Sequence, residues 1–133
     1  FTDLAGTQVA ASHAGWRGLE AGILENTVHA MQAEPPEIIA WLGPAIGPDA
    51  FEVGEEVREA FLQHDLNAAE AFRPSPAGRW LADIYLLARQ RLAGVGIKQV
   101  YGGGLCTYSD EERFFSFRRD RETGRMASLI WIE

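Results

Sequence analysis

Residues 12–18 concentrate side chains that can do chemistry. They read Ser-His-Ala-Gly-Trp-Arg-Gly and place the imidazole of His13, an indole and the guanidinium of Arg17 in a turn with two glycines. The turn joins an apolar run over residues 9–11 to a helix-period run that begins at Leu19. A strand that leads through such a turn into a helix directs free backbone N–H groups at one spot, which favours anions or polar substrate edges. Binding or catalysis at this turn is one interpretation, and a purely structural turn is the other.

A thiol and a hydroxyl form the second candidate. Cys106 and Thr107 follow the triple glycine of residues 102–104, which comes directly after an expected strand over residues 97–101. Cys106 could serve as a zinc ligand, as a nucleophile or as a small buried hydrophobe. A dyad of Cys106 with His13, as in a cysteine-type hydrolase, is an alternative that the spacing does not test.

Arginines and acids supply the candidate contacts to a polar ligand. Arg17, Arg118 and Arg119 could each hold a phosphate, because a guanidinium forms paired hydrogen bonds to an oxyanion. For Arg119 we favour a salt bridge to a neighbouring acid instead. Glu52 and Asp83 are candidates for polar contacts to a sugar or a base.

Length and composition are typical of one soluble globular domain. The chain has 133 residues, of which 47% are apolar and 23% are charged. Its formal net charge of −7 argues against a nucleic-acid partner, because such binding needs a basic face. We expect neither a membrane span nor a signal peptide. One cysteine fits a reducing compartment, so we expect a cytoplasmic protein. Because the first residue is Phe1, we also expect upstream sequence.

The apolar periodicity predicts an α+β fold, in which helices pack on a mixed sheet. Helices are expected over residues 19–32, 54–64 and 81–92. Strands are expected over residues 7–12, 38–42, 50–53, 97–101 and 126–132. Loops with glycine or proline are expected over residues 43–48 and 73–78, and the first of them could form the wall of a pocket.

The sequence His-Ala-Gly-Trp-Arg-Gly at residues 13–18 resembles the signature of the YfiH-type, or laccase-domain, family. Further segments resemble that family in the same order and extend to the end of the chain. They are residues 41–48, 51–54, 81–85, 103–108, 115–120 and 123–126. Matching segments in order over nearly the whole chain are far more specific than any single motif.

The resemblance implies a zinc enzyme that phosphorolyses adenosine, inosine, guanosine and methylthioadenosine, with adenosine deaminase activity beside it. Members have also been described as copper-using polyphenol oxidases, which is the alternative. The family holds its metal with two histidines and a cysteine, and only His13 corresponds to one of these ligands. The other two lie upstream of the motif in the family. Residues 1–133 are therefore expected to be the C-terminal, larger part of one domain whose N-terminal part is missing, so we expect weak or no metal binding by this chain alone. An inactive fragment is a further alternative.

With the resemblance, His13 and Arg17 become the expected catalytic residues, and His13 is also the expected metal ligand. The expected substrate-binding residues are Glu52, Asp83, Cys106, Thr107 and Arg118. The expected partners are a purine nucleoside and phosphate, without nucleic acid or membrane, and we expect a monomer.

A multicopper site fits this sequence poorly. Such a site needs many imidazoles and a thiolate, whereas the chain has three scattered histidines and one cysteine. Copper can displace zinc from a nitrogen and sulfur site because its affinity is higher, so an oxidase activity could arise from the wrong metal.

Overall fold

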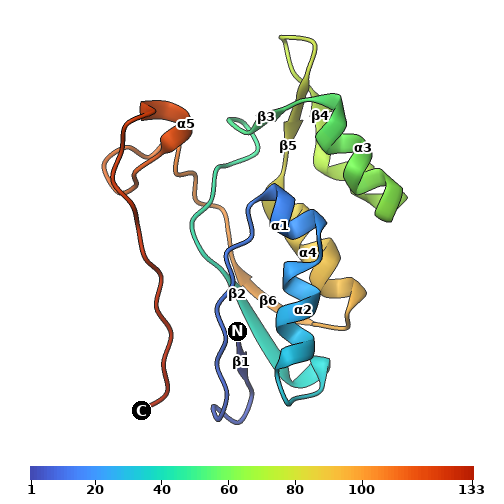
Figure 1. Cartoon of the computed structure of the whole chain (residues 1–133), viewed down its shortest axis with the longest axis vertical. Coiled ribbons are helices and arrows are strands. Elements are labelled where there is room, and N and C mark those ends of the chain that lie inside the picture. Colours follow the sequence, from blue (N-terminus) through green and yellow to red (C-terminus); the bar gives the residue numbers. More distant parts are fainter. The chain divides into compact units, whose positions relative to one another are not determined.

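The computed structural model describes all residues from 1 to 133 (Figure 1). The chain forms two compact units, each built from separate stretches of sequence. The first unit comprises Phe1–Gly43, Leu87–Gly102 and Ser128–Glu133. The second unit comprises Pro44–Leu86 and Gly103–Ala127. None of the helices has the length and apolar character that crossing a membrane requires.

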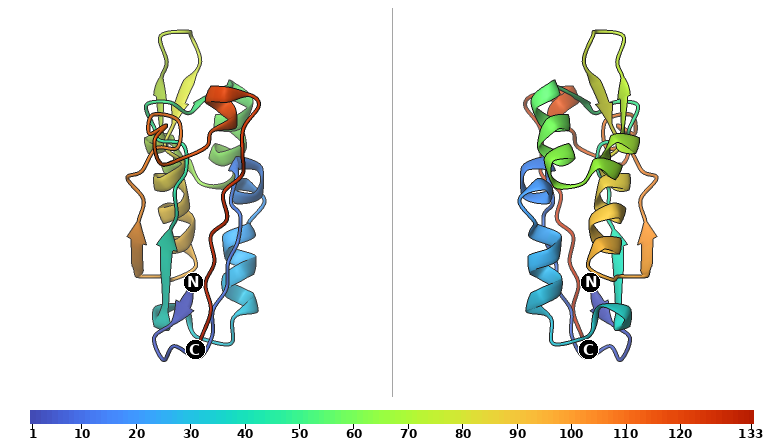
Figure 2. Two further views of the ribbon diagram at one scale, coloured as in Figure 1. Left: turned by 90° about the vertical axis from the view of Figure 1, so that its left-hand side faces the viewer. Right: turned by 90° about the vertical axis from the view of Figure 1, so that its right-hand side faces the viewer.

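The first unit contains a mixed three-stranded sheet. Its central strand β2 (Ile38–Leu42) pairs antiparallel with β1 (Thr2–Asp3) and parallel with β6 (Gln99–Gly102). Both views of Figure 2 show β2 between its two partners. Ile38 and Ala40 are buried, because alternate residues of a strand point to one face. The expected strands at 38–42 and 97–101 are thus confirmed, the latter with a shift of two residues at its start.

Helices cover one side of this sheet. In Figure 1, α2 (Ile23–Ala30) and the end of α4 (Ile84–Gly94) lie on the same side of the strands. A buried ion pair between Glu25 of α2 and Arg91 of α4 joins the two helices, and Arg91 also donates to the carbonyl of Glu20 at 3.2 Å. The expected arrangement of helices on a mixed sheet is confirmed in this unit.

The second unit contains an antiparallel sheet in the order β3 (Glu52–Val53), β5 (Trp80–Ala82) and β4 (Phe72–Pro74). Helix α3 (Glu55–His64) confirms the helix expected over residues 54–64, and the 3₁₀ helix η2 (Leu66–Ala71) follows it. Phe61 of α3 packs against Phe72, with ring centroids 6.1 Å apart, and both side chains are buried. This contact anchors α3 to the sheet.

Two helix predictions need correction. The helix expected over residues 19–32 is interrupted, because α1 ends at Glu20 and α2 begins at Ile23 after Gly22. Gly22 has a φ of 87°, a left-handed conformation that breaks the α-helical backbone. Helix α4 begins at Ile84 rather than residue 81, because the three residues before Asp83 pair in β5.

Three strand and loop predictions also need correction. Residues 7–12 form only an isolated bridge, between Val9 and Thr2. The expected loop at 73–78 begins inside β4, so the β4–β5 hairpin was missed. Residues 126–132 do not pair as a strand. An alternating pattern makes a strand only where a neighbouring strand completes the hydrogen-bond ladder.

Candidate functional site

The turn at residues 13–18 opens α1 (Trp16–Glu20) in the first unit. The His13 imidazole is exposed and is not enclosed by apolar side chains. The Arg17 guanidinium is also exposed and lies 4.5 Å from the centroid of the Trp16 ring, within cation–π range. The imidazole and the guanidinium of this turn are therefore at the surface of the unit, and Trp16 is half-buried.

The glycines of this turn have ordinary backbone angles. Gly15 has a φ of −64°, and neither Gly15 nor Gly18 adopts a positive φ. A Cβ at position 15 would lie 3.5 Å from Nε2 of His13, which is ordinary van der Waals contact. Neither backbone strain nor crowding therefore requires glycine at position 15.

Tyr85 joins two loops in the second unit. Its hydroxyl accepts a hydrogen bond from the Ala45 amide at 2.7 Å and donates one to the Leu105 carbonyl at 2.9 Å. Burial raises the pKa of this phenol, so Tyr85 stays protonated and can donate. The same two loops also meet where the Thr107 amide donates to the Ala45 carbonyl at 2.9 Å. The proline-containing loop and the cysteine turn are therefore held as one structure.

The Cys106 thiol lies where these loops meet and is half-buried. Sγ accepts from the amides of Gly47 at 3.2 Å and Ser109 at 3.4 Å. Burial raises the pKa of the thiol, but hydrogen bonds from the Ser109 side chain and from the backbone of residues 47, 108 and 109 outweigh burial and place the pKa below its ordinary value. A Cβ at position 47 would lie 3.1 Å from Sγ, so Gly47 permits this approach.

Arg118 and Glu52 lie together in the second unit. Nη1 of Arg118 donates to the Glu52 carbonyl at 2.8 Å, and its guanidinium carbon is 5.6 Å from the centroid of the Phe51 ring. The Glu52 carboxylate accepts from Ser75 Oγ at 2.8 Å and is 3.7 Å from Nη1 of Arg79. Two of the expected substrate-binding residues are thus brought into contact.

Both residues line a groove of about 740 Å³. Its polar lining includes Asp49, Glu52, Arg73, Tyr108, Ser109 and Arg118. Guanidinium groups, carboxylates and hydroxyls on one surface can bind a ligand that carries both an anionic group and hydroxyls. Cys106 does not line this groove, although Tyr108 and Ser109, two and three residues further along the chain, do.

Asp83 and Thr107 make hydrogen bonds within the fold, and their expected contacts to a substrate stay predictions. Asp83 accepts a hydrogen bond from the Leu86 amide at 2.9 Å and so caps the first turn of α4. The Thr107 carbonyl accepts from Nη1 of Arg119 at 3.0 Å. Arg119 also pairs with Asp120 at 2.7 Å, as preferred from the sequence.

Sequence reasoning missed several groove and loop residues. Tyr85 was read only as part of an apolar helix face, although its hydroxyl ties two loops. Ser75 and Arg73 fell in a stretch read as surface loop, although Ser75 is buried and bonds to Glu52. The buried position of Ser75 follows from the β4–β5 hairpin, which gave only a weak signal in the sequence.

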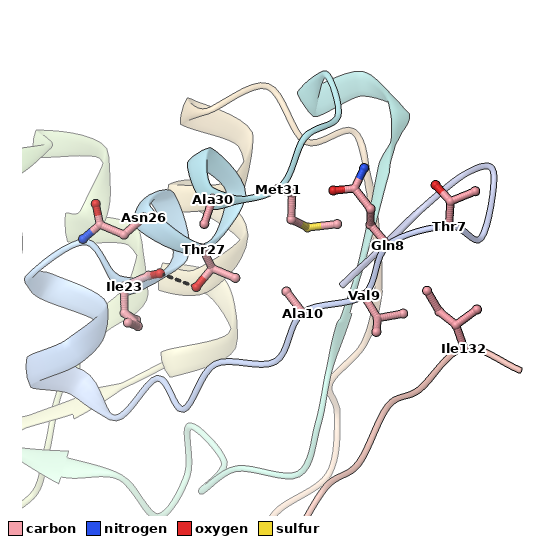
Figure 3. Close-up of a pocket in the computed structure, with 10 residues that line it drawn as sticks. All are labelled: Thr7, Gln8, Val9, Ala10, Ile23, Asn26, Thr27, Ala30, Met31 and Ile132. Atoms are coloured by element: carbon pink, nitrogen blue, oxygen red, sulfur yellow. Dashed lines mark hydrogen bonds between the residues drawn. The ribbon is translucent and has the colours of Figure 1, made fainter.

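A second groove, of about 700 Å³, lies in the first unit between residues 7–10 and α2 (Figure 3). Val9, Ala10, Ile23 and Met31 give it a mostly apolar lining. None of the expected site residues lines it, so it has no share in the chemistry predicted above.

The structure contains no group of three or more histidine, cysteine, aspartate or glutamate side chains that could hold a metal ion. A catalytic zinc normally has three protein ligands. Residues 1–133 by themselves therefore do not fit a complete zinc site, and His13 alone cannot supply one.

Fold and sequence together define the class of protein. The chain belongs to the multi-copper polyphenol oxidoreductase laccase family, whose model matches residues 1–133.

The names of individual relatives differ from the description of the family. The chain is 61% identical over 132 residues to purine nucleoside phosphorylase YfiH of Escherichia coli (strain K12). This match covers 99% of this chain and 54% of the relative. It is 55% identical over 135 residues to a purine nucleoside phosphorylase of Haemophilus influenzae, which covers 100% of this chain and 55% of the relative. A crystal structure of a Neisseria meningitidis protein matches with a TM-score of 0.96 at 55% identity, over 99% of this chain and 55% of that chain. The chain thus spans about half the length of these relatives.

Proposed function

We propose that the intact protein is a purine nucleoside phosphorylase and that residues 1–133 are the C-terminal, larger part of its single domain. The observation that carries this proposal is that Arg118, which donates to the backbone carbonyl of Glu52, lines the same polar groove as Glu52. The names of the relatives in Escherichia coli and Haemophilus influenzae support the same activity. A monomer in the cytoplasm remains our expectation.

Phosphorolysis requires two binding functions in one site. A phosphate oxygen must form a bond to the anomeric carbon of the ribose, while the bond to the purine breaks and the base leaves with the electron pair and takes up a proton. Arg118 and Arg73 supply positive charge for phosphate, and Glu52 supplies a carboxylate that can accept from ribose hydroxyls. Cys106 and Thr107 belong to the turn that adjoins this groove.

The roles of His13 and Arg17, which lie in the first unit, are a separate part of the proposal. His13 would be one ligand of a zinc ion whose other protein ligands lie outside residues 1–133, and Arg17 would contact an anionic group of the substrate. Zinc would supply Lewis acidity, including the activated water that adenosine deamination needs. Activity on adenosine, inosine, guanosine and methylthioadenosine, with deamination of adenosine beside it, is part of this proposal.

The test is a nucleoside assay on the metal-analysed, full-length protein. Inosine should be converted to hypoxanthine and ribose 1-phosphate only when phosphate is present, as measured by chromatography. Arg118→Lys should raise the KM for phosphate severalfold, because lysine keeps the charge and loses the paired geometry. Arg58→Lys, on α3 and away from the groove lining, is the matched control. Release of hypoxanthine at the same rate without phosphate would refute the proposal.

A copper-dependent polyphenol oxidase is the second candidate, and the description of the family favours it. The full-length protein loaded with zinc alone, and then with copper alone, should be assayed for phenol oxidation and for inosine cleavage. We expect inosine cleavage with zinc and phenol oxidation only with copper. Phenol oxidation by a zinc-loaded sample free of copper would make the polyphenol oxidase the first candidate and the nucleoside phosphorylase the second. A cysteine-type hydrolase using Cys106 and His13, or an inactive fragment, stays a further alternative.

A further inference from the structure

One face of the sheet in the first unit is apolar and open. Ile38 and Ala40 of β2 are buried on the face that carries the helices. On the opposite face, Trp41 is 59% exposed, and its neighbour on β6, Tyr101, is 55% exposed. Figure 1 shows α2 and α4 on one side of these strands only.

The pairing of β2 with β6 makes this exposure unusual. The two strands are parallel, with Trp41 beside Tyr101 and Ile39 beside Gln99 in register, so these four side chains share the open face. Parallel strands occur almost only in sheets that are covered on both faces, and their sequences are apolar on both faces. The run Ile-Ile-Ala-Trp-Leu of β2 has this two-sided apolar character.

The indole of Trp41 lies close to the backbone at two glycines. A Cβ at Gly102 would lie 2.8 Å from Nε1 of Trp41, and a Cβ at Gly43 would lie 3.3 Å from its Cζ3. The glycines therefore let the ring rest closely on the backbone. A large aromatic ring that lies on the backbone and is more than half exposed is typical of a contact surface.

The C-terminal residues add a second apolar strip in the same unit. Residues 128–133 run extended beside the sheet, as Figure 1 shows, and do not pair as a strand. Ile132 also lines the groove between residues 7–10 and α2 (Figure 3). Leu129, Ile130, Trp131 and Ile132 are all exposed. The open face (Ile39, Trp41, Gln99 and Tyr101), apolar except for Gln99, and this strip together have the composition of a core that lacks its other half.

We propose that polypeptide of the same protein, lying outside residues 1–133, covers the open face and residues 128–133. The chain matches only 54% of its Escherichia coli relative and 55% of the Neisseria meningitidis structure, so proteins of this kind carry nearly as much chain again. A second copy of this chain fits less well, because each copy carries a net charge of −7 and two copies would repel. This proposal is independent of the nucleoside activity.

Hydroxyl-radical footprinting of the unmodified full-length protein tests the proposal directly. The side chains of Trp41, Tyr101 and Trp131 should be oxidised severalfold more slowly than their intrinsic reactivities predict, at every protein concentration. Oxidation at the intrinsic rate would overturn the proposal. Protection that is lost on dilution, together with a dimer in sedimentation, would overturn it in favour of a second copy.

A pair of substitutions gives an independent readout in the full-length protein. Tyr101→Asp should lower the Tm by several degrees, because it places a charge in a buried contact. Leu66→Asp is the matched control, since Leu66 is 79% exposed on η2 and lies outside the open face, and its Tm should stay within about a degree of wild type. Equal effects of the two substitutions would overturn the proposal.

Discussion

The Cys106 thiol combines partial exposure with stabilisation of its charged form. Burial acts against the thiolate, but hydrogen bonds from Ser109 and from neighbouring backbone amides favour it, and the pKa falls below the ordinary value. Because the thiolate is the reactive form, this residue should react at a lower pH than a free cysteine does. Its lowered pKa also fits a site in which negative charge is accommodated.

We expect alkylation of Cys106 by iodoacetamide to rise with pH to a midpoint below the value of about 8.5 for a free thiol. Ser109→Ala should move the midpoint upward, because it removes the side-chain hydrogen bond to the thiolate. Ser75→Ala, which removes a bond to Glu52 instead, should leave the midpoint unchanged. Mass spectrometry of the Cys106 peptide measures the rates. A midpoint at or above that of the free thiol would contradict the structure.

Asp83 has a structural role that a sequence alone does not separate from substrate binding. Its carboxylate caps α4 through the Leu86 amide. Asp83→Ala should therefore lower the free energy of unfolding by about 1 kcal/mol. Asp83→Asn should lower the free energy of unfolding much less, because asparagine caps a helix as well as aspartate does. Urea unfolding measures both. If Asp83 also contacts the nucleoside, Asp83→Asn will lower kcat/KM at unchanged stability, and unchanged kcat/KM would confine it to the fold.

At the scale of elements, glycines decide where helices and strands end. Gly22 separates α1 from α2 with a left-handed backbone, and Gly102 ends β6 with a φ of 74°. At Gly102 the surroundings are also tight, since a Cβ there would collide with the Leu42 carbonyl and the Trp41 ring. Gly78, in the β4–β5 turn, has a similar φ of 72° but no atom within 4 Å of its Cβ position.

These two glycines make a matched pair for measurement. Gly78→Ala should destabilise the protein by about 1 kcal/mol, the cost of a left-handed alanine. Gly102→Ala should lower the free energy of unfolding clearly more. The alanine there has the same unfavourable left-handed backbone, and its methyl group also collides with neighbouring atoms. Urea unfolding of both variants separates the two effects. Equal losses would show that the β2–β6 edge relaxes freely around a methyl group.

At the scale of the whole molecule, the two units are interleaved along the chain. The chain passes from one unit to the other after Gly43, Leu86, Gly102 and Ala127, and the second of these passages lies inside helix α4. A continuous helix shared in this way makes it costly for either unit to unfold while the other stays folded.

We therefore expect one cooperative unfolding transition. One variant keeps only Trp41 as a fluorescent reporter of the first unit, and another keeps only Trp80 as a reporter of the second. In each variant, fluorescence and circular dichroism should give the same melting temperature. Circular dichroism of each variant provides the common reference for its overall stability. Midpoints that differ between fluorescence and circular dichroism within one variant would show that the units unfold separately.

Parts of the fold and site follow from local sequence. Local apolar patterns were sufficient for β2, α3 and most of α4. Residues 38–42 form a continuous apolar run, and each of the two helices buries one stripe of its own residues. The preference of Arg119 for Asp120 was also predictable, because the two residues are adjacent in sequence. The β4–β5 hairpin and the unpaired residues 126–132 were not, because strand pairing depends on a partner elsewhere in the chain.

The sequence by itself determined the α+β class, the glycine-bounded turn at His13 and the resemblance to one family, because motifs and periodicity are local or ordered along the chain. Only the tertiary structure decided that Arg118 meets Glu52, that Tyr85 ties two loops to each other and that Asp83 caps a helix. Those contacts join residues up to 66 positions apart or depend on where a helix begins, and both are fixed by packing of the whole unit rather than by neighbours in the chain.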